Sequence, residues 1–179
     1  YTSCMSLPML GITGWPHSGM QKAAKYLLED RGFLGIEVSH YQELIDIASM
    51  VRDAANTLKL KTNPQSLFTV YRKMGFGYFL DRIKTSVAQD NSQDGSGIVV
   101  VPLLDMQLFE ALKRSYCNMK LLRVDADSVT RFARSRWPKT HDKGQDYRDY
   151  MEFQSGEAKF FGLEGLLSRA DFVVNNNIS

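Results

Sequence analysis

The sequence predicts an α/β fold, a three-layer α/β/α sandwich around a mostly parallel five-stranded sheet. Short apolar runs alternate along the chain with longer segments in which apolar residues recur at helical spacing. One of these runs, Ile98–Val101, shows no alternation of polar and apolar residues, which is typical of a strand covered by helices on both faces. With 179 residues and no internal repeat, the chain is expected to form a single domain over residues 1–179.

The first half of the chain opens with the order strand, glycine loop, helix, strand. Glycines close both the first strand and the helix that follows it. In chain order we expect a strand at 9–13, a helix from Met20 that Gly32 ends, a strand at 33–38, helical stretches at 41–51 and 64–74, and a polar surface loop at 89–97.

The second half continues the alternation of strands and helices. We expect strands at 98–101, 119–124 and 172–174, a helix at 105–116 with Asp105 as its N-cap, a basic helix at 128–136, a polar segment at 137–144 and a long helix to about residue 168. Asn175–Asn177, after the last strand, are expected to be turn residues.

The composition is that of an ordinary globular protein, with 44% hydrophobic and 23% charged residues. The net charge of +2 and the pI near 8.5 fall short of the basic balance typical of nucleic-acid-binding proteins, so charge neither requires nor excludes RNA. No apolar run is long enough to span a bilayer, and we expect no membrane insertion. His17, His40, His141 and the two cysteines share no metal-ligand spacing, so neither a metal site nor a disulfide framework is predicted.

The chain begins at Tyr1 rather than at a methionine. Removal of an organelle-targeting peptide accounts for such a start. An expression fragment, or an N-terminus that precedes the given sequence, accounts for it equally well, so these explanations stay open.

The glycine loop follows the pattern of a phosphate-binding loop only in part. In GxxxxGK[ST], backbone N–H groups wrap the phosphates, the lysine reaches the outer phosphates and the hydroxyl ligates magnesium. Gly14 and Gly19 have this spacing between a strand and a helix, but Met20 and Gln21 stand at the lysine and hydroxyl positions. Methionine carries no charge and glutamine offers only a neutral oxygen, so magnesium-dependent phosphoryl transfer is expected to be severely impaired.

No nearby cation obviously replaces the missing lysine. Lys22 and Lys25 lie further along the helix, on the side opposite the predicted buried stripe of Ala23–Ala24. We therefore prefer the interpretation in which Gly14 and Gly19 only form a strand-to-helix turn. The loop is then a non-functional remnant, and no cofactor is expected.

Several segments resemble, in the same order, the dephospho-CoA kinase and deoxynucleoside monophosphate kinase group. Met9–Gly14 resembles its first strand and Gly32–Phe33 the start of its second strand. Val124–Ala126 followed by Arg131–Arg134 resembles its lid-bearing helix, and Arg169–Asn176 resembles its final strand. The resemblance therefore covers nearly the whole chain.

This resemblance implies a P-loop nucleotide-kinase-like sandwich with the glycine-loop strand in its centre, flanked by strands 98–101 and 119–124. The chain departs from the group at the loop and at two other places. Ser39–His40 stand where several relatives place an acid, and 102–105 lacks the arginine that many place after the third strand. The loss of phosphate-handling residues at several places is the pattern expected of a pseudoenzyme.

The resemblance also implies a lid-like segment at about 128–147 that closes over phosphates. Arg131, Arg134 and Arg136 match this region, and with Trp137 and Lys139 they form a basic projection with an aromatic residue at its tip. We expect these residues to contact an anion, an acidic protein surface or RNA phosphates, with Trp137 as the anchor. In the alternative interpretation Trp137 packs onto its own domain and the arginines are hydrated.

These observations favour a catalytically degenerate kinase-like protein that serves as a structural or assembly subunit of a large complex. We expect an organellar ribonucleoprotein such as the mitochondrial ribosome, with other protein subunits and RNA as candidate partners, in the mitochondrial matrix or otherwise the cytoplasm. One alternative is an active small-molecule kinase of the dephospho-CoA kinase or deoxynucleoside monophosphate kinase type, in which Lys22 or the lid arginines supply the cation and ATP and magnesium are the cofactors. The other is a nucleotide-binding sensor without turnover.

Overall fold

The computed structural model describes residues 8–38, 76–89, 97–138, 140 and 142–177. The chain forms two compact units, residues 1–37 with 92–179, and residues 38–91. The second unit contributes one described helix, α4 (Phe76–Gln89). The predicted helical stretches at 41–51 and 64–74, and most of the predicted loop at 89–97, lie outside the described residues.

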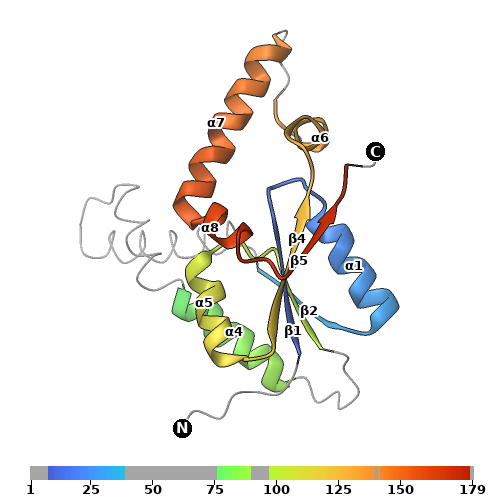
Figure 1. Ribbon diagram of the computed structural model, residues 1–179, viewed down its shortest axis with the longest axis vertical. Coiled ribbons are helices and arrows are strands. Elements are labelled where there is room, and N and C mark those ends of the chain that lie inside the picture. The colour runs from blue at the N-terminus through green and yellow to red at the C-terminus, as the bar shows by residue number, and fades with distance from the viewer. Residues whose placement is uncertain (1–7, 39–75, 90–96, 139, 141, 178–179) are drawn as a thin grey trace, which may run out of the picture. The chain divides into compact units, whose positions relative to one another are not determined.

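A five-stranded parallel sheet forms the centre of the first unit (Figure 1). Its strands lie in the order β2-β3-β1-β4-β5. They are β1 (Met9–Gly14), β2 (Leu34–Glu37), β3 (Ile98–Val101), β4 (Met119–Asp125) and β5 (Phe172–Asn175). Met9 pairs in parallel with Ile98 on one side and with Met119 on the other. The predicted α/β fold and the central place of the glycine-loop strand are therefore confirmed.

Helices cover both faces of this sheet. In the first unit they are α1 (Met20–Arg31), α5 (Met106–Ser115), α6 (Ser128–Arg134), α7 (Lys143–Phe161) and α8 (Leu163–Leu167). Helix α1 packs against β1, β2 and β3, while α5 and α8 contact each other on the opposite face (Figure 1). None of the described helices is long and apolar enough to cross a bilayer.

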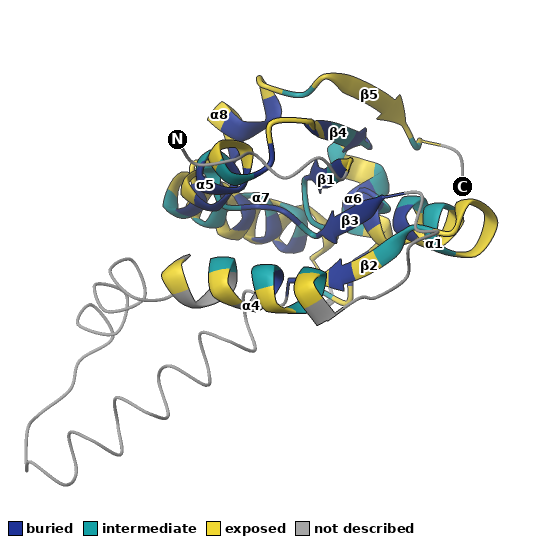
Figure 2. Cartoon of the chain, turned by 90° about the horizontal axis from the view of Figure 1, so that it is seen from below, coloured by how far each residue is buried: buried dark blue, intermediate teal, exposed yellow. Residues whose placement is uncertain are grey.

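Burial differs sharply between the inner strands and the β5 edge (Figure 2). All four residues of β3 are buried, as its unbroken apolar run predicts. Phe172, Val173 and Val174 of β5 are all exposed. The similar apolar composition of the two strands therefore did not distinguish a central strand from an edge strand.

Asp105 caps α5, as predicted. Its Oδ1 accepts hydrogen bonds from the backbone N–H groups of Gln107, at 2.7 Å, and Leu108, at 3.1 Å. These donors belong to the first turn of the helix and have no partner within it. The cap therefore supplies acceptors that the helix itself lacks.

We expect Asp105→Ala to lower the free energy of unfolding by about 1 kcal/mol, because the first turn loses its side-chain acceptor. Urea denaturation of the full chain measures this loss. Gln107→Ala, at an exposed position in the same turn, is the control and should change stability much less. Equal losses in the two variants would contradict the capping role.

Three details of the second half differ from the predictions. The long helix expected to reach about residue 168 is two helices, because Gly162 adopts a left-handed conformation (φ 67°) and ends α7. Asn175 belongs to β5 rather than to a turn. Cys117 takes part in a disulfide, which the spacing of the cysteines did not predict.

Candidate functional site

The glycine loop joins the carboxyl end of β1, the central strand, to the start of α1 (Figure 1). Doubly wound α/β proteins bind ligands at this edge of the sheet, where the strand order reverses. Gly19 caps α1 with a φ of 104°, in the left-handed region that favours glycine. A Cβ at Gly14 would lie 2.4 Å from the backbone oxygen of Val124, so close packing also requires glycine there.

Asn176 holds the loop from the far end of the chain. Its Nδ2 donates a hydrogen bond of 2.8 Å to the backbone oxygen of Ser18. A Cβ at Gly19 would lie 2.1 Å from the same nitrogen. Asn176 was expected to be a turn residue, whereas the structure places its side chain against the loop, because β5 runs parallel to β4 and ends at the same edge of the sheet as the loop.

The hydroxyl-bearing side chains beneath the loop are buried. Ser18 and Thr13 are fully buried, and neither Oγ of Ser18 nor Oγ1 of Thr13 has a hydrogen-bond partner among the described residues. His17 has a φ of 66°, which is uncommon for a residue other than glycine. The loop thus combines a strained backbone with buried polar groups, as functional loops often do.

Met20 and Gln21 turn away from each other at the start of α1. Met20 is only 8% exposed and belongs to the core. Gln21 is exposed, and its Nε2 lies 3.4 Å from Oε1 of Glu37 at the end of β2. Position 20 therefore contributes an apolar thioether to the interior, and the amide of Gln21 is directed to a carboxylate.

Arg131, on α6, lies against the glycine loop. Its guanidinium carbon is 4.9 Å from the centroid of the Trp15 ring, a cation–π distance. Its Nε donates to the backbone oxygen of Ala126 at 3.2 Å, and its Nη1 donates to Oε1 of Gln154. Only 5% of Arg131 is exposed, so these contacts hold a buried cation.

Gln154, on α7, connects this arginine to the loop. Its Nε2 donates to the hydroxyl of Tyr150 at 2.7 Å and lies 3.4 Å from the backbone oxygen of Pro16. Gln154 is 2% exposed and Tyr150 is 1% exposed. We call Trp15, Pro16, Arg131, Tyr150 and Gln154 the loop–lid cluster, because they join the glycine loop to α6 and α7, the region for which the sequence resemblance predicted a lid.

The structure corrects the prediction that Arg131 belongs to an exposed contact face. That residue is buried because α6 turns it towards Trp15 and Gln154, and it is not available to an external partner. Arg134 and Arg136 are exposed. The Trp137 ring packs on Tyr150 and Phe153, at centroid distances of 5.8 and 5.4 Å, as the alternative interpretation expected. Lys139 lies outside the described residues.

Arg131 is the charged member of the loop–lid cluster. The pKa of His17 is lowered, first by partial burial of the imidazole and second by the positive charge of Arg131. The side chain of His17 is nevertheless exposed to solvent. Burial raises the pKa of the Tyr150 phenol, so Tyr150 stays protonated near neutral pH. No carboxylate forms an ion pair with Arg131 in the described part of the chain. The cation is thus held by neutral acceptors and an aromatic ring.

Glu157 lies on α7, one turn beyond Gln154, and burial raises the pKa of its carboxyl to about 7. Between the unfolded value of 4.5 and about 7, the folded protein therefore binds a proton that the unfolded chain does not. Stability must fall as the pH rises through this window.

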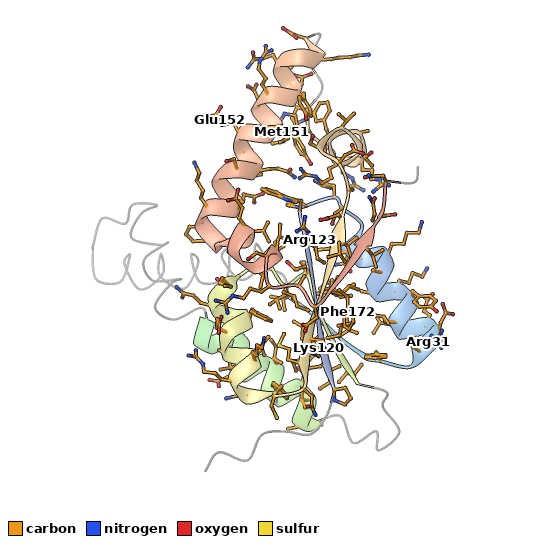
Figure 3. All side chains as sticks on the ribbon, viewed as in Figure 1. Arg31, Lys120, Arg123, Met151, Glu152 and Phe172 are labelled. Carbon is orange, nitrogen blue, oxygen red and sulfur yellow. The ribbon has the colours of Figure 1, made fainter. Side chains whose placement is uncertain are left out.

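We expect Glu157→Gln to remove most of this dependence and to stabilise the chain above pH 7 by on the order of 2 kcal/mol. Thermal unfolding from pH 4 to 8 measures the effect. The control is Glu152→Gln, because Figure 3 shows Glu152 pointing outward from the same helix. A pH profile that Glu157→Gln leaves unchanged would contradict the assignment.

No group of three or more histidine, cysteine, aspartate or glutamate side chains suited to a metal ion occurs within the described ranges. Two features beside the loop attract anions: the N-terminus of α1, which has no side-chain cap, and the nearby Arg131. The two residues that follow Gly19 are the uncharged Met20 and Gln21.

No protein-family model and no curated protein matches the chain. Among solved structures, a shikimate kinase from Bacteroides thetaiotaomicron has a TM-score of 0.52 at 12% identity, over 95% of this chain and 86% of that chain. A dephospho-CoA kinase from Campylobacter jejuni has a TM-score of 0.51 at 15% identity, over 96% and 89%. A Thermus thermophilus protein has a TM-score of 0.55 at 17% identity, over 98% and 91%. These similarities show that the chain has the α/β fold of the P-loop kinases.

Proposed function

We propose that this chain is a kinase-fold protein that no longer transfers phosphate and that serves as a structural or assembly subunit of a larger complex. The observation that carries the proposal is the environment of Met20, whose side chain is buried in the core at the position of the phosphate-binding lysine. Phosphoryl transfer depends almost entirely on positioned positive charge and magnesium. A loop with an apolar residue at this position and an amide at Gln21 is poorly suited to that chemistry.

The loop–lid cluster supports a fixed role rather than a catalytic cycle. A kinase lid must open and close around its substrates. Here Arg131 and Gln154 are nearly fully buried, and they hydrogen-bond to protein groups rather than to water. Opening of the lid would break these hydrogen bonds. A lid that stays attached to its loop suits a subunit with a constant shape.

Our proposal for the kind of complex comes from the sequence. We propose other protein subunits, and RNA as a second partner, within an organellar ribonucleoprotein of the mitochondrial matrix. Its test is the size of the particle that contains the full chain in gentle extracts of its source cells. Migration in a large particle that ribonuclease disrupts supports the proposal, and migration as a free monomer contradicts it.

A second function, nucleotide binding with or without turnover, is favoured by one observation. Arg131 comes from the lid-like segment and lies 4.9 Å from the ring of the loop residue Trp15, so a cation is already present beside the loop. A nucleotide phosphate would have to attract Arg131 away from Ala126 and Gln154. Saturable ATP binding that Arg131→Met removes, while the fold is kept, would favour this function.

A further inference from the structure

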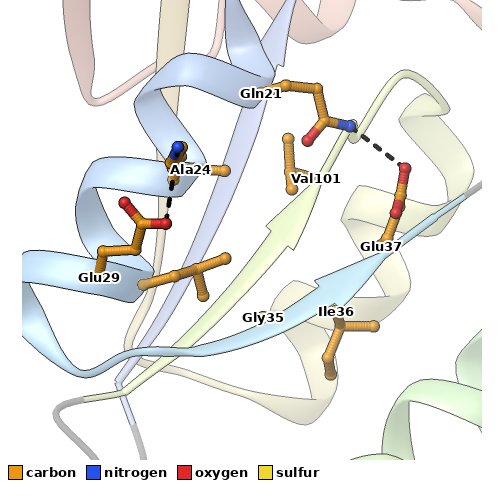
Figure 4. Close-up of a pocket in the computed structure, with 9 residues that line it drawn as sticks. Gln21, Ala24, Glu29, Gly35, Ile36, Glu37 and Val101 are labelled. Atoms are coloured by element: carbon orange, nitrogen blue, oxygen red, sulfur yellow. Dashed lines mark hydrogen bonds and ion pairs between the residues drawn. The ribbon is translucent and has the colours of Figure 1, made fainter.

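A pocket of about 350 Å³ lies between α1 and the edge strand β2 (Figure 4). Its apolar lining includes Ala24 and Leu28 of α1 and Val101 of β3. Lys25, Glu29 and Glu37 supply its charged groups. The volume is within the range of small binding sites, and the lining combines an apolar surface with a few polar groups, as binding sites do.

The charges of this pocket favour a cationic ligand. Lys25 Nζ and Glu29 Oε1 form an exposed ion pair at 3.7 Å. Glu37 has only the neutral amide of Gln21 at 3.4 Å, and no ion pair with a cation in the described part of the chain. One lysine against two glutamates leaves one net negative charge. A cation on an aliphatic stem, such as an arginine side chain, fits both the apolar lining and this charge.

The backbone beside the pocket is suited to an extended chain. Strand β2 pairs with β3 and with no other described strand. The N–H of Leu34 donates to Gly97 on the β3 side at 2.9 Å. Because successive residues of a strand direct their N–H and C=O groups to alternate sides, Gly35 and Glu37 direct theirs away from β3. No described strand pairs with these groups.

Gly35 links this open edge to the pocket. A Cβ at Gly35 would lie 2.8 Å from Cδ2 of Leu28, so Leu28 packs directly on the backbone of Gly35. Glycine has no side chain that would separate this leucine from a neighbouring strand. Paired strands lie roughly 4.8 Å apart. An arginine opposite Gly35 on an added strand would therefore contact Leu28 with its aliphatic stem. Its guanidinium would then extend towards the carboxylates of Glu37 and Glu29.

We propose that the β2 edge binds an extended segment of a partner protein by strand addition, with an arginine of that segment in the pocket. Backbone bonds to Gly35 and Glu37 supply the pairing, and the carboxylates of Glu37 and Glu29 select the guanidinium. Binding at the β2 edge rests on the proposed function in one respect only, namely that the chain has a partner protein. It does not depend on the state of the glycine loop, and nucleotide binding does not test it.

The test titrates the full chain with a blocked valine–arginine–valine–threonine peptide, and with the same peptide carrying citrulline, a neutral analogue of arginine. We expect the arginine peptide to bind about tenfold more tightly at low salt, and this preference to shrink as salt is added. Backbone amide NMR shifts should be largest at Gly35 and Glu37. Equal binding of the two peptides, no binding, or shifts elsewhere would overturn the proposal.

Variants and a small probe complete the test. Glu37→Gln should abolish the preference for arginine over citrulline, whereas Glu164→Gln, at an exposed position on α8, should retain it. A preference that survives Glu37→Gln overturns the assignment of the pocket. If blocked arginine amide alone binds as tightly as the peptide, the site takes a small cation and strand addition is wrong.

Discussion

Met20→Lys combined with Gln21→Ser is expected to raise the affinity of the isolated chain for magnesium ATP by at least about tenfold, because each charge-assisted contact to a phosphate contributes roughly 1.5 to 3 kcal/mol. The scaffold for this gain is present. Gly14 and Gly19 stand at the ends of the loop, and α1 begins directly after it. Lysine is long enough to carry its ammonium out of the buried position of Met20 towards the loop.

Isothermal titration of the double variant measures the gain. Met20→Leu combined with Gln21→Ser is the matched control, since it changes the same positions without adding charge and should gain little. Urea denaturation must show that both variants are folded, because position 20 is part of the core. A folded lysine variant with no higher affinity than its control would show that the loop itself cannot hold phosphate.

Arg131→Met is expected to lower the free energy of unfolding by about 2 to 4 kcal/mol, because buried acceptors lose their donor. Oε1 of Gln154 and the backbone oxygen of Ala126 both accept from the guanidinium. The cation–π contact with Trp15 is lost as well. Methionine keeps much of the side-chain volume, so the loss measures polar contacts more than packing.

A double-mutant cycle separates this cluster from ordinary packing. Arg131→Met with Gln154→Leu should cost clearly less than the sum of the two single changes, because each single change already breaks their shared hydrogen bond. Arg136→Met, on the exposed surface, should stay within about 0.5 kcal/mol of the parent chain. Additive losses at residues 131 and 154 would contradict the loop–lid cluster.

Most of the sheet was predictable because strands and helices leave different periodicities in a sequence. The unbroken run Ile98–Val101 predicted a buried strand, and the resemblance to the kinase group predicted the glycine-loop strand between strands 98–101 and 119–124. The break at Gly162 was missed because a glycine within a helical pattern signals an end only if its backbone turns left-handed. The exposure of β5 was missed because an edge strand can have the same apolar composition as a central one.

The site was predicted only where a local motif exists. Gly14, Gly19, Met20 and Gln21 were found through their spacing. Gln154 and Asn176 were missed because their partners, Arg131 and Ser18, lie far from them in sequence and no spacing rule links them. Arg131 was expected on the surface because a charged residue in a basic helix is usually solvated. The packing of α6 against α7 and the glycine loop shows that Arg131 instead contacts Trp15 and Gln154 in the interior.

The turnover of magnesium ATP by the purified, unmodified chain tests the proposed loss of phosphoryl transfer most directly. We expect no phosphate release above the buffer blank, since neither Met20 nor Gln21 stabilises the charge of a transferring phosphoryl group. Turnover that stays with the chain through purification would contradict it. Its loss in Lys22→Met or Arg131→Met, in a variant that urea denaturation shows to be folded, would then identify the cation that replaces the missing lysine.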